Sequence, residues 1–202
     1  MDSRAVMVGV LLARRPGELG EWLADASAFE AAGAAALWVD PAPESELDPL
    51  ALLAALAALT SRSLLVAALP AAARPSGALA STLATVGRLS HGRLGLLLEP
   101  EIIEPERPDG LALDPALVAG FATFRRLPGE PGAFECTREG HEAECWIQTP
   151  SPEGRAAWRA ALDSAGERGA DGLLVPAGPR LLDILRNPDD PGERRDLQLA
   201  HG

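Results

Sequence analysis

The chain alternates short, continuous apolar segments with longer segments whose apolar residues recur at helical spacing. The apolar segments are rich in Val, Leu and Ala, a pattern typical of strands buried on both faces. They cover residues 5–13, 35–40, 63–70, 93–99, 143–149 and 169–176. Strands that are separated by helices in this way form a parallel sheet with right-handed crossovers.

The helices predicted between these strands have recognisable ends. Asp48 is an N-cap followed by proline at the first helical position, and Gly33 closes the first helix in a left-handed conformation. Further helices are predicted over residues 76–90, from Asp114 to about residue 125, from Ser151 and from Gly178. The segment before the strand at 143–149 is rich in turn residues and suits a hairpin.

The number of predicted strands is small for a complete barrel. A (β/α)8 barrel usually needs about 250 residues. This chain has 202 residues, and its pattern contains about six strands. We therefore expect an α/β, TIM-barrel-like parallel (β/α) fold that is shortened or incomplete relative to eight units. Residues 1–188 would form its single domain, and residues 189–202 a polar C-terminal arm.

Charge and composition exclude several classes of partner. The net charge is −11, and all 18 cationic residues are arginines that are scattered along the chain, which has no lysine and no tyrosine. Phosphate-rich surfaces require clustered cations, so we expect neither a nucleic acid nor a membrane as partner. The two cysteines lack the spacing of a metal or redox motif, and no apolar segment is long enough to cross a bilayer. We expect a soluble, cytoplasmic protein with reduced thiols.

Several short motifs follow one another between Val8 and Glu99. They are "FEAAGAAALWVD" at 29–40, the Thr60-Ser61-Arg62 turn, the Arg74-Pro75 step and the Ser90-x-Gly92-Arg93 turn. In this order and at this spacing they resemble the luciferase-like flavin-dependent oxidoreductases, the family of bacterial luciferase and alkanal monooxygenase. Residues 146–188 are similar to a closing βα unit of the same family.

The resemblance implies a flavin-dependent monooxygenase that acts on a small-molecule substrate. The implied cofactor is reduced FMN supplied by a separate flavin reductase, and a deazaflavin is the alternative. No nicotinamide fingerprint is present, which suits a two-component system. We also expect a homodimer, or a heterodimer with a full-length paralogue, because an open sheet leaves edges and apolar helix faces that need cover.

The candidate site lies where the strands end, because barrel chemistry occurs at the carboxyl ends of the strands. The candidate catalytic residues are Arg74, Asp40 and Glu99, and the candidate cofactor-binding residues are Leu12, Ala13, Pro70, Arg74, Gln148, Gly178 and Arg180. Arg180 lies in the first turn of a helix, where free amides and a guanidinium suit a flavin phosphate. The alternative is a surface ion pair with Asp183 or Asp189. For the acidic residues the alternative is an ordinary role in turns.

Two other groups of residues have a simpler structural interpretation. Arg93 precedes its strand, so it lies on the amino-terminal face of the barrel, where we expect it to bind neighbouring backbone and carboxylates. His141, Glu144 and Cys145 are too few ligands for zinc, which takes four.

Two further functions stay open. A non-catalytic, shortened relative would bind flavin without turnover or serve as the partner subunit of a full-length paralogue. A flavin-free enzyme would use the same barrel mouth for another reaction, since a fold alone does not determine a function.

Overall fold

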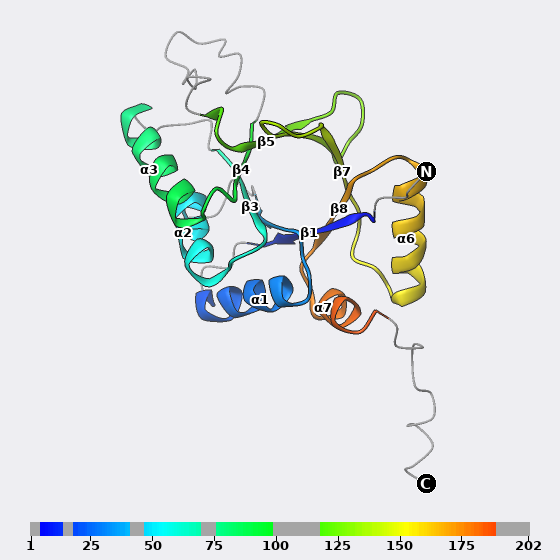
Figure 1. Cartoon of the computed structure of the whole chain (residues 1–202). Helices are drawn as coiled ribbons and strands as arrows, with labels where there is room; N and C mark the ends of the chain where they lie inside the picture. Colours follow the sequence, from blue (N-terminus) through cyan, green and yellow to red (C-terminus); the bar gives the residue numbers. More distant parts are fainter. Residues whose placement is uncertain (1–4, 14–17, 41–46, 70–75, 99–117, 189–202) are drawn as a thin grey trace.

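The computed structural model describes residues 5–13, 18–40, 47–69, 76–98 and 118–188, and these form one closed barrel of eight strands (Figure 1). The strands are β1 (Met7–Leu12), β2 (Ala36–Val39), β3 (Leu64–Ala68), β4 (Leu94–Leu97), β5 (Ala122–Arg126), β6 (Ala133–Thr137), β7 (Glu144–Gln148) and β8 (Gly172–Pro176). Each strand pairs with the next in sequence, and β8 pairs with β1 to close the sheet. The expected TIM-barrel-like fold is confirmed. The estimate of about six strands is wrong.

The two additional strands, β5 and β6, explain how the barrel closes in a short chain. Strand β6 is antiparallel to both β5 and β7, whereas all other neighbouring pairs are parallel. A parallel pair needs a long crossover, but an antiparallel pair needs only a turn. Residues 127–132 and 138–143 are such turns, so the predicted hairpin is confirmed.

The helix predicted from Asp114 is wrong at its end, because Ala122 begins β5. Phe121 and Phe124 are three positions apart, which mimics helical spacing. The structure separates them: Phe121 packs against Gly87 outside the sheet, and Phe124 is fully buried inside the barrel. The interior positions of β5 therefore follow the period of two that strands require.

Five helices cover the outside of the barrel in the described ranges, and they flank β1 to β4 and β8 (Figure 1). They are α1 (Leu19–Ala31), α2 (Pro49–Leu59), α3 (Ser76–Leu89), α6 (Arg155–Glu167) and α7 (Pro179–Arg186). No described helix covers the β5–β6 hairpin, whose outward side chains are polar: Thr123, Arg125, Glu135 and Thr137. An antiparallel hairpin tolerates this exposure because only one of its faces needs to be buried. None of the described helices is long and apolar enough to cross a membrane.

Four aromatic rings fill the interior of the barrel. Trp38 contacts Phe124, Phe134 and Trp146, with ring centroids 4.5, 5.2 and 6.5 Å away. Small residues on neighbouring strands make the space: a Cβ atom on Gly172 would lie 2.5 Å from the Trp146 ring. The barrel is therefore a packed core in its middle, and any ligand must bind at one of its ends.

The Thr60-Ser61-Arg62 turn, Glu30 and Arg93 form a network of hydrogen bonds at the amino-terminal face, which we call the clamp. The Glu30 carboxylate accepts hydrogen bonds from the backbone amides of Ser61 and Arg62, at 2.8 and 2.6 Å. The Arg93 guanidinium donates to the carbonyls of Thr60 and Ser63, both at 2.8 Å. The structural role expected for Arg93 is thereby confirmed. Burial of this guanidinium lowers the pKa of Arg93, and the nearby Glu30 opposes that shift.

Removing the guanidinium of Arg93 should destabilise the barrel without changing the structure at its opposite, carboxyl-terminal end. For Arg93→Met we expect a loss of about 2–3 kcal/mol of unfolding free energy, since hydrogen bonds to charged groups contribute about 1.5–3 kcal/mol. Arg93→Lys keeps the charge but not the planar fork, so it should lose an intermediate amount. Urea denaturation measures both variants. Equal stability of Arg93→Met and the parent chain would show that the clamp contributes nothing.

Candidate functional site

The carboxyl ends of the parallel strands meet at one end of the barrel, which we call the mouth. Six of the predicted site residues lie in the described part of the chain, namely Leu12, Ala13, Asp40, Gln148, Gly178 and Arg180. The other three, Pro70, Arg74 and Glu99, lie outside the described residues. Five of them divide between two places, one beside the barrel and one at the mouth itself, and Arg180 lies on the exposed surface of α7.

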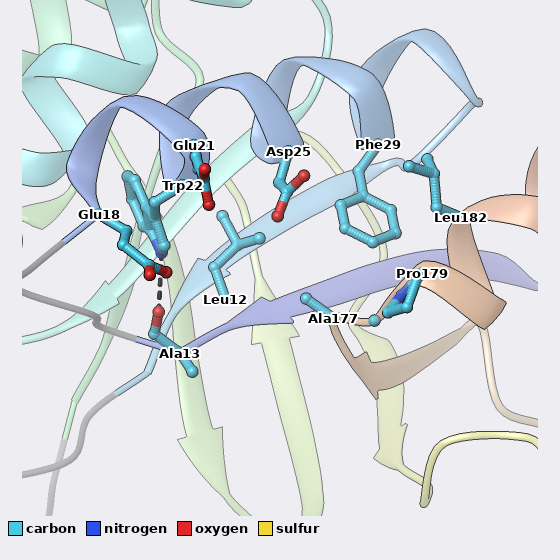
Figure 2. A pocket seen from close by; sticks show the side chains of 11 residues that line it. Leu12, Ala13, Glu18, Glu21, Trp22, Asp25, Phe29, Ala177, Pro179 and Leu182 are labelled. Atoms are coloured by element: carbon cyan, nitrogen blue, oxygen red, sulfur yellow. Dashed lines mark hydrogen bonds between the residues drawn. The ribbon is translucent and has the colours of Figure 1, made fainter.

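The first place is a cavity between α1 and α7, outside the sheet (Figure 2). Leu12, Ala13 and Gly178 line it at the ends of β1 and β8. The cavity has a volume of about 170 Å³, and the buried rings of Trp22 and Phe29 form part of its wall. The Trp22 indole N–H is already used, because it donates to the Ala13 carbonyl at 2.8 Å.

The charge of this cavity opposes the predicted phosphate. The described residues of its lining include the carboxylates of Glu18, Glu21 and Asp25, and none of the described lining residues is basic. Arg180 is exposed and is not among the lining residues, although it follows Pro179 at the start of α7. A phosphate here would face three carboxylates, so the helix terminus alone does not make the cavity a flavin phosphate site.

The second place is the mouth. Asp40 directly follows β2, and its side chain is partly buried. Gln148 ends β7 and is exposed. Arg126 ends β5, with its guanidinium carbon 5.3 Å from the centre of the Phe134 ring, so it lies on the interior side of the hairpin at the same end. The mouth therefore combines an acid, an amide and a cation above an aromatic interior.

Trp38 adds a feature to this region that the sequence does not reveal. Its ring is 2% exposed, and its indole N–H has no hydrogen-bond partner in the part of the chain that the structure describes. A buried polar group without a partner costs free energy comparable to a lost hydrogen bond, so such groups call for an explanation. The ring itself belongs to the core, because it contacts Phe124, Phe134 and Trp146. The unpartnered N–H lies two residues before Asp40 in the same chain segment.

Sequence reasoning missed Arg126 and Phe134 because it did not resolve the hairpin strands. The sequence does contain the alternation that strands require. Ala122, Phe124 and Arg126 occupy every second position and alternate with polar residues that face outward. Once β5 is known to be a strand, the last interior position must reach the mouth.

Glu144 and Cys145, which the sequence places near His141, lie on opposite faces of β7. Glu144 is buried and accepts a hydrogen bond from the Trp146 indole N–H at 3.1 Å. Cys145 is on the outer side, with its backbone amide bound to Asp171. The described residues contain no group of three or more ligating side chains suited to a metal ion.

The two thiols should control stability at alkaline pH. Burial raises the pKa of Cys136 to about 11, with a smaller contribution from the Glu144 carboxylate, and burial also raises the pKa of Cys145. Between about pH 9 and 11 the unfolded chain loses the Cys136 proton while the folded chain keeps it. Stability therefore falls as pH rises through this window, by about 1.4 kcal/mol per pH unit for one such group.

This effect is measurable because the chain has no lysine and no tyrosine, whose titration would otherwise overlap. Urea denaturation at pH 8.5 and 10.5 should show the loss for the parent chain and a smaller loss for Cys136→Ala. An unchanged loss in Cys136→Ala would assign the effect to other groups.

Comparison with known proteins gives one family and one fold. Residues 7–106 match the family described as luciferase-like monooxygenase. No curated protein matches the chain. Among solved structures, tryptophan synthase from M. tuberculosis superposes with a TM-score of 0.54 at 15% identity, covering 91% of each chain. This similarity shows the barrel fold alone.

Two further structures give weaker superpositions. EDTA monooxygenase (EmoA) from Chelativorans sp. BNC1 has a TM-score of 0.41 at 18% identity, over 47% of this chain and 28% of its own. Riboflavin lyase (RcaE), determined with modified FMN and riboflavin, has a TM-score of 0.40 at 16% identity, over 85% of this chain and 62% of its own. The chain thus spans less than two thirds of either protein. The resemblance to the luciferase-like monooxygenase family is confirmed for residues 7–106, which contain β1 to β4.

Proposed function

We propose that the protein is a flavin-dependent oxidoreductase of the monooxygenase type, acting in the cytoplasm on a small-molecule substrate with reduced FMN from a separate reductase. The observation that carries the proposal is the family match over residues 7–106. The matched segment supplies β1 to β4, and their carboxyl ends form half of the mouth.

The residues at the mouth fit a flavin better than those of the cavity between α1 and α7. The unpartnered indole N–H of Trp38 suits a carbonyl acceptor, and the Gln148 amide can both donate and accept. Arg126 offers a cation for the phosphate or for a ring carbonyl. Asp40 remains the candidate acid or base among the described residues. The proposal also includes three residues that the sequence predicts for the site and that lie outside the described residues: Arg74, Pro70 and Glu99.

When bound, reduced flavin supplies the electrons for oxygen chemistry, and the chain contributes binding, orientation and exclusion of water. Four buried aromatic side chains close the barrel below the mouth, namely Trp38, Phe124, Phe134 and Trp146. Water therefore cannot reach a flavin ring at the mouth from that side. In this scheme the aromatic interior forms the floor of the site.

Titration with FMN tests the proposal. The indoles of Trp38 and Trp146 lie in the barrel, so tryptophan fluorescence should be quenched by oxidised FMN and, under anaerobic conditions, by reduced FMN. Arg126→Gln should weaken binding about tenfold, the loss expected for one charge-assisted hydrogen bond. Arg159→Gln, on the exposed side of α6, is the matched control and should bind like the parent chain. The same titration with a deazaflavin tests the alternative cofactor. Failure of all these ligands to bind would overturn the proposal.

A second candidate is the partner subunit of a longer paralogue that has no turnover of its own. The hairpins at β5 to β7 favour it, because they replace helix-covered units with turns and so leave fewer segments around the mouth. This candidate predicts flavin binding without substrate oxidation, together with a stable complex with the paralogue. Multiple-turnover oxidation by the purified chain with reductase would exclude it.

A further inference from the structure

Two tryptophans of the aromatic interior differ in what their indole N–H groups contact. Trp38 and Trp146 are each 2% exposed. The N–H of Trp38 has no hydrogen-bond partner among the described residues, whereas the N–H of Trp146 donates to the Glu144 carboxylate at 3.1 Å. Within the described part of the chain, Trp146 therefore has a base at its N–H and Trp38 has none.

Glu144 is an unusual residue for the interior of this barrel. It lies two positions before Trp146 on β7, so both side chains face the same side of the sheet, and it is 9% exposed. Its register partner on β6 is Cys136, another buried residue. Burying a carboxylate costs free energy, and a neutral indole compensates for less of this cost than a cation would. Packing alone would favour an apolar residue at this position, which indicates a chemical role for the carboxylate.

Aromatic rings connect the mouth of the barrel to Glu144. The ring centroids of Trp38 and Trp146 are 6.5 Å apart, and Phe124 lies against both, at 4.5 and 6.1 Å. Trp38 lies two residues before Asp40 at the mouth, and the N–H of Trp146 is turned toward Glu144 on the amino-terminal side. Electrons move rapidly between aromatic rings that are this close. An oxidation that begins at Trp38 therefore reaches Trp146.

The surroundings of Trp146 keep its ring dry and in one position. A Cβ atom on Gly9 would lie 2.8 Å from this ring and one on Gly172 2.5 Å, so the backbones of β1 and β8 pack directly against it. A ring that is held this tightly changes its environment little when it loses an electron, which favours electron transfer. The chain contains no tyrosine, a residue to which tryptophan radicals readily pass their oxidation.

We propose that Trp38, Trp146 and Glu144 form a relay that carries one oxidising equivalent from the mouth into the barrel. A one-electron oxidant at the mouth takes an electron from Trp38, which becomes a radical cation. Trp146 then gives an electron to Trp38 and its Nε1 proton to Glu144. The products are the oxidant reduced by one electron, a neutral Trp146 radical and a neutral carboxylic acid. The electron held by the reduced oxidant and the proton on Glu144 later return and restore the indole.

The difference between the two N–H groups gives the relay its direction. An indole that has lost an electron is a strong acid at its N–H, and it is stabilised when a base in contact takes the proton. Glu144 is that base for Trp146, so the oxidising equivalent rests there rather than on Trp38. The relay thereby draws the equivalent away from a substrate bound at the mouth. An oxidised flavin excited by light is an oxidant of the required class, and with that oxidant the inference rests on the proposed function.

A photo-oxidant attached at the mouth tests the relay without any flavin. The reference protein is the full chain with Arg126→Cys, at the exposed end of β5, and Cys145→Ala. A ruthenium polypyridyl label is attached to the thiol at position 126, and Cys136, which is 1% exposed, stays unlabelled. A flash in the presence of a soluble electron acceptor oxidises the label. Transient absorption then separates neutral from protonated tryptophan radicals, and we expect the neutral radical.

Three variants of this reference protein identify the residues involved. Glu144→Gln still accepts a hydrogen bond from the Trp146 indole but cannot take its proton, so the neutral radical should be lost and the protonated radical should appear. Trp38→Phe removes the first step, so the Trp146 radical should be lost. Trp158→Phe changes a buried tryptophan of α6, outside the sheet, and is the matched control that should behave like the reference protein. Circular dichroism checks that each variant is folded.

Three results would each overturn the proposal. They are a neutral radical of unchanged yield in folded Glu144→Gln, an unchanged rate of radical formation in folded Trp38→Phe, and no tryptophan radical in the reference protein although its label is oxidised. The same flash experiment is repeated with FMN and the unlabelled parent chain, after FMN binding has been measured by titration. If FMN does not bind, the proposed function fails, and the labelled protein still decides whether the relay exists.

Discussion

Replacing Gly172 with alanine is expected to lower the unfolding free energy by about 3 kcal/mol, the upper part of the range for overpacking a rigid core. A Cβ atom at this position would lie 2.5 Å from Cδ2 and Cε3 of Trp146. Gly172 and Trp146 are register partners on β8 and β7, so the indole lies across the glycine and cannot move without displacing the other rings. Thermal or urea denaturation measures the loss.

Two variants make this test specific. Gly20→Ala on α1 has no atom within 4 Å of the new Cβ, so it should be neutral or stabilising by up to about 1 kcal/mol through helix propensity. Trp146→Leu should lose stability by itself but should reduce the additional cost of Gly172→Ala when the two are combined. Additive effects of the two substitutions would mean that the indole does not cause the loss.

Truncation of Trp38 to alanine is expected to cost about 3–5 kcal/mol, as for other buried aromatic residues. The ring contacts Phe124, Phe134 and Trp146, so its removal leaves a cavity at the centre of the aromatic interior. Urea denaturation measures the loss of unfolding free energy, provided that the dependence of this free energy on urea concentration is the same in both proteins. A loss below about 1 kcal/mol would show that the surrounding rings collapse into the space.

Trp38→Phe separates the packing of the ring from its N–H group. The indole N–H has no partner among the described residues, so losing it removes no hydrogen bond within them, and we expect a cost of only about 1–2 kcal/mol from lost volume. If the N–H serves a ligand at the mouth, FMN binding should weaken about tenfold in the same variant. Unchanged FMN affinity in folded Trp38→Phe would remove Trp38 from the proposed site.

Local sequence patterns predicted α1, α2, α3, α6 and α7 and six of the eight strands correctly, because their causes are local. Asp48 and Pro49 begin α2 as expected, and the side chain of Asp48 caps the helix. The apolar segments around β1, β2 and β8 became strands buried on both faces. The prediction failed between Asp114 and Arg126, since two phenylalanines at helical spacing pack on different sides of the sheet.

The sequence by itself determined the fold class, the parallel order of the βα units and the structural role of Arg93, because periodicity, capping and position before a strand act over short distances. Only the tertiary structure decided that the barrel closes with eight strands, since closure depends on register between strands far apart in the chain. It also separated the two groups of site residues. Leu12, Ala13 and Gly178 meet beside the carboxylates of Glu18, which precedes α1, and of Glu21 and Asp25 within it, whereas Arg126 and Gln148 reach the mouth. This separation depends on how the strands curve around the aromatic interior. No local sequence pattern encodes that curvature.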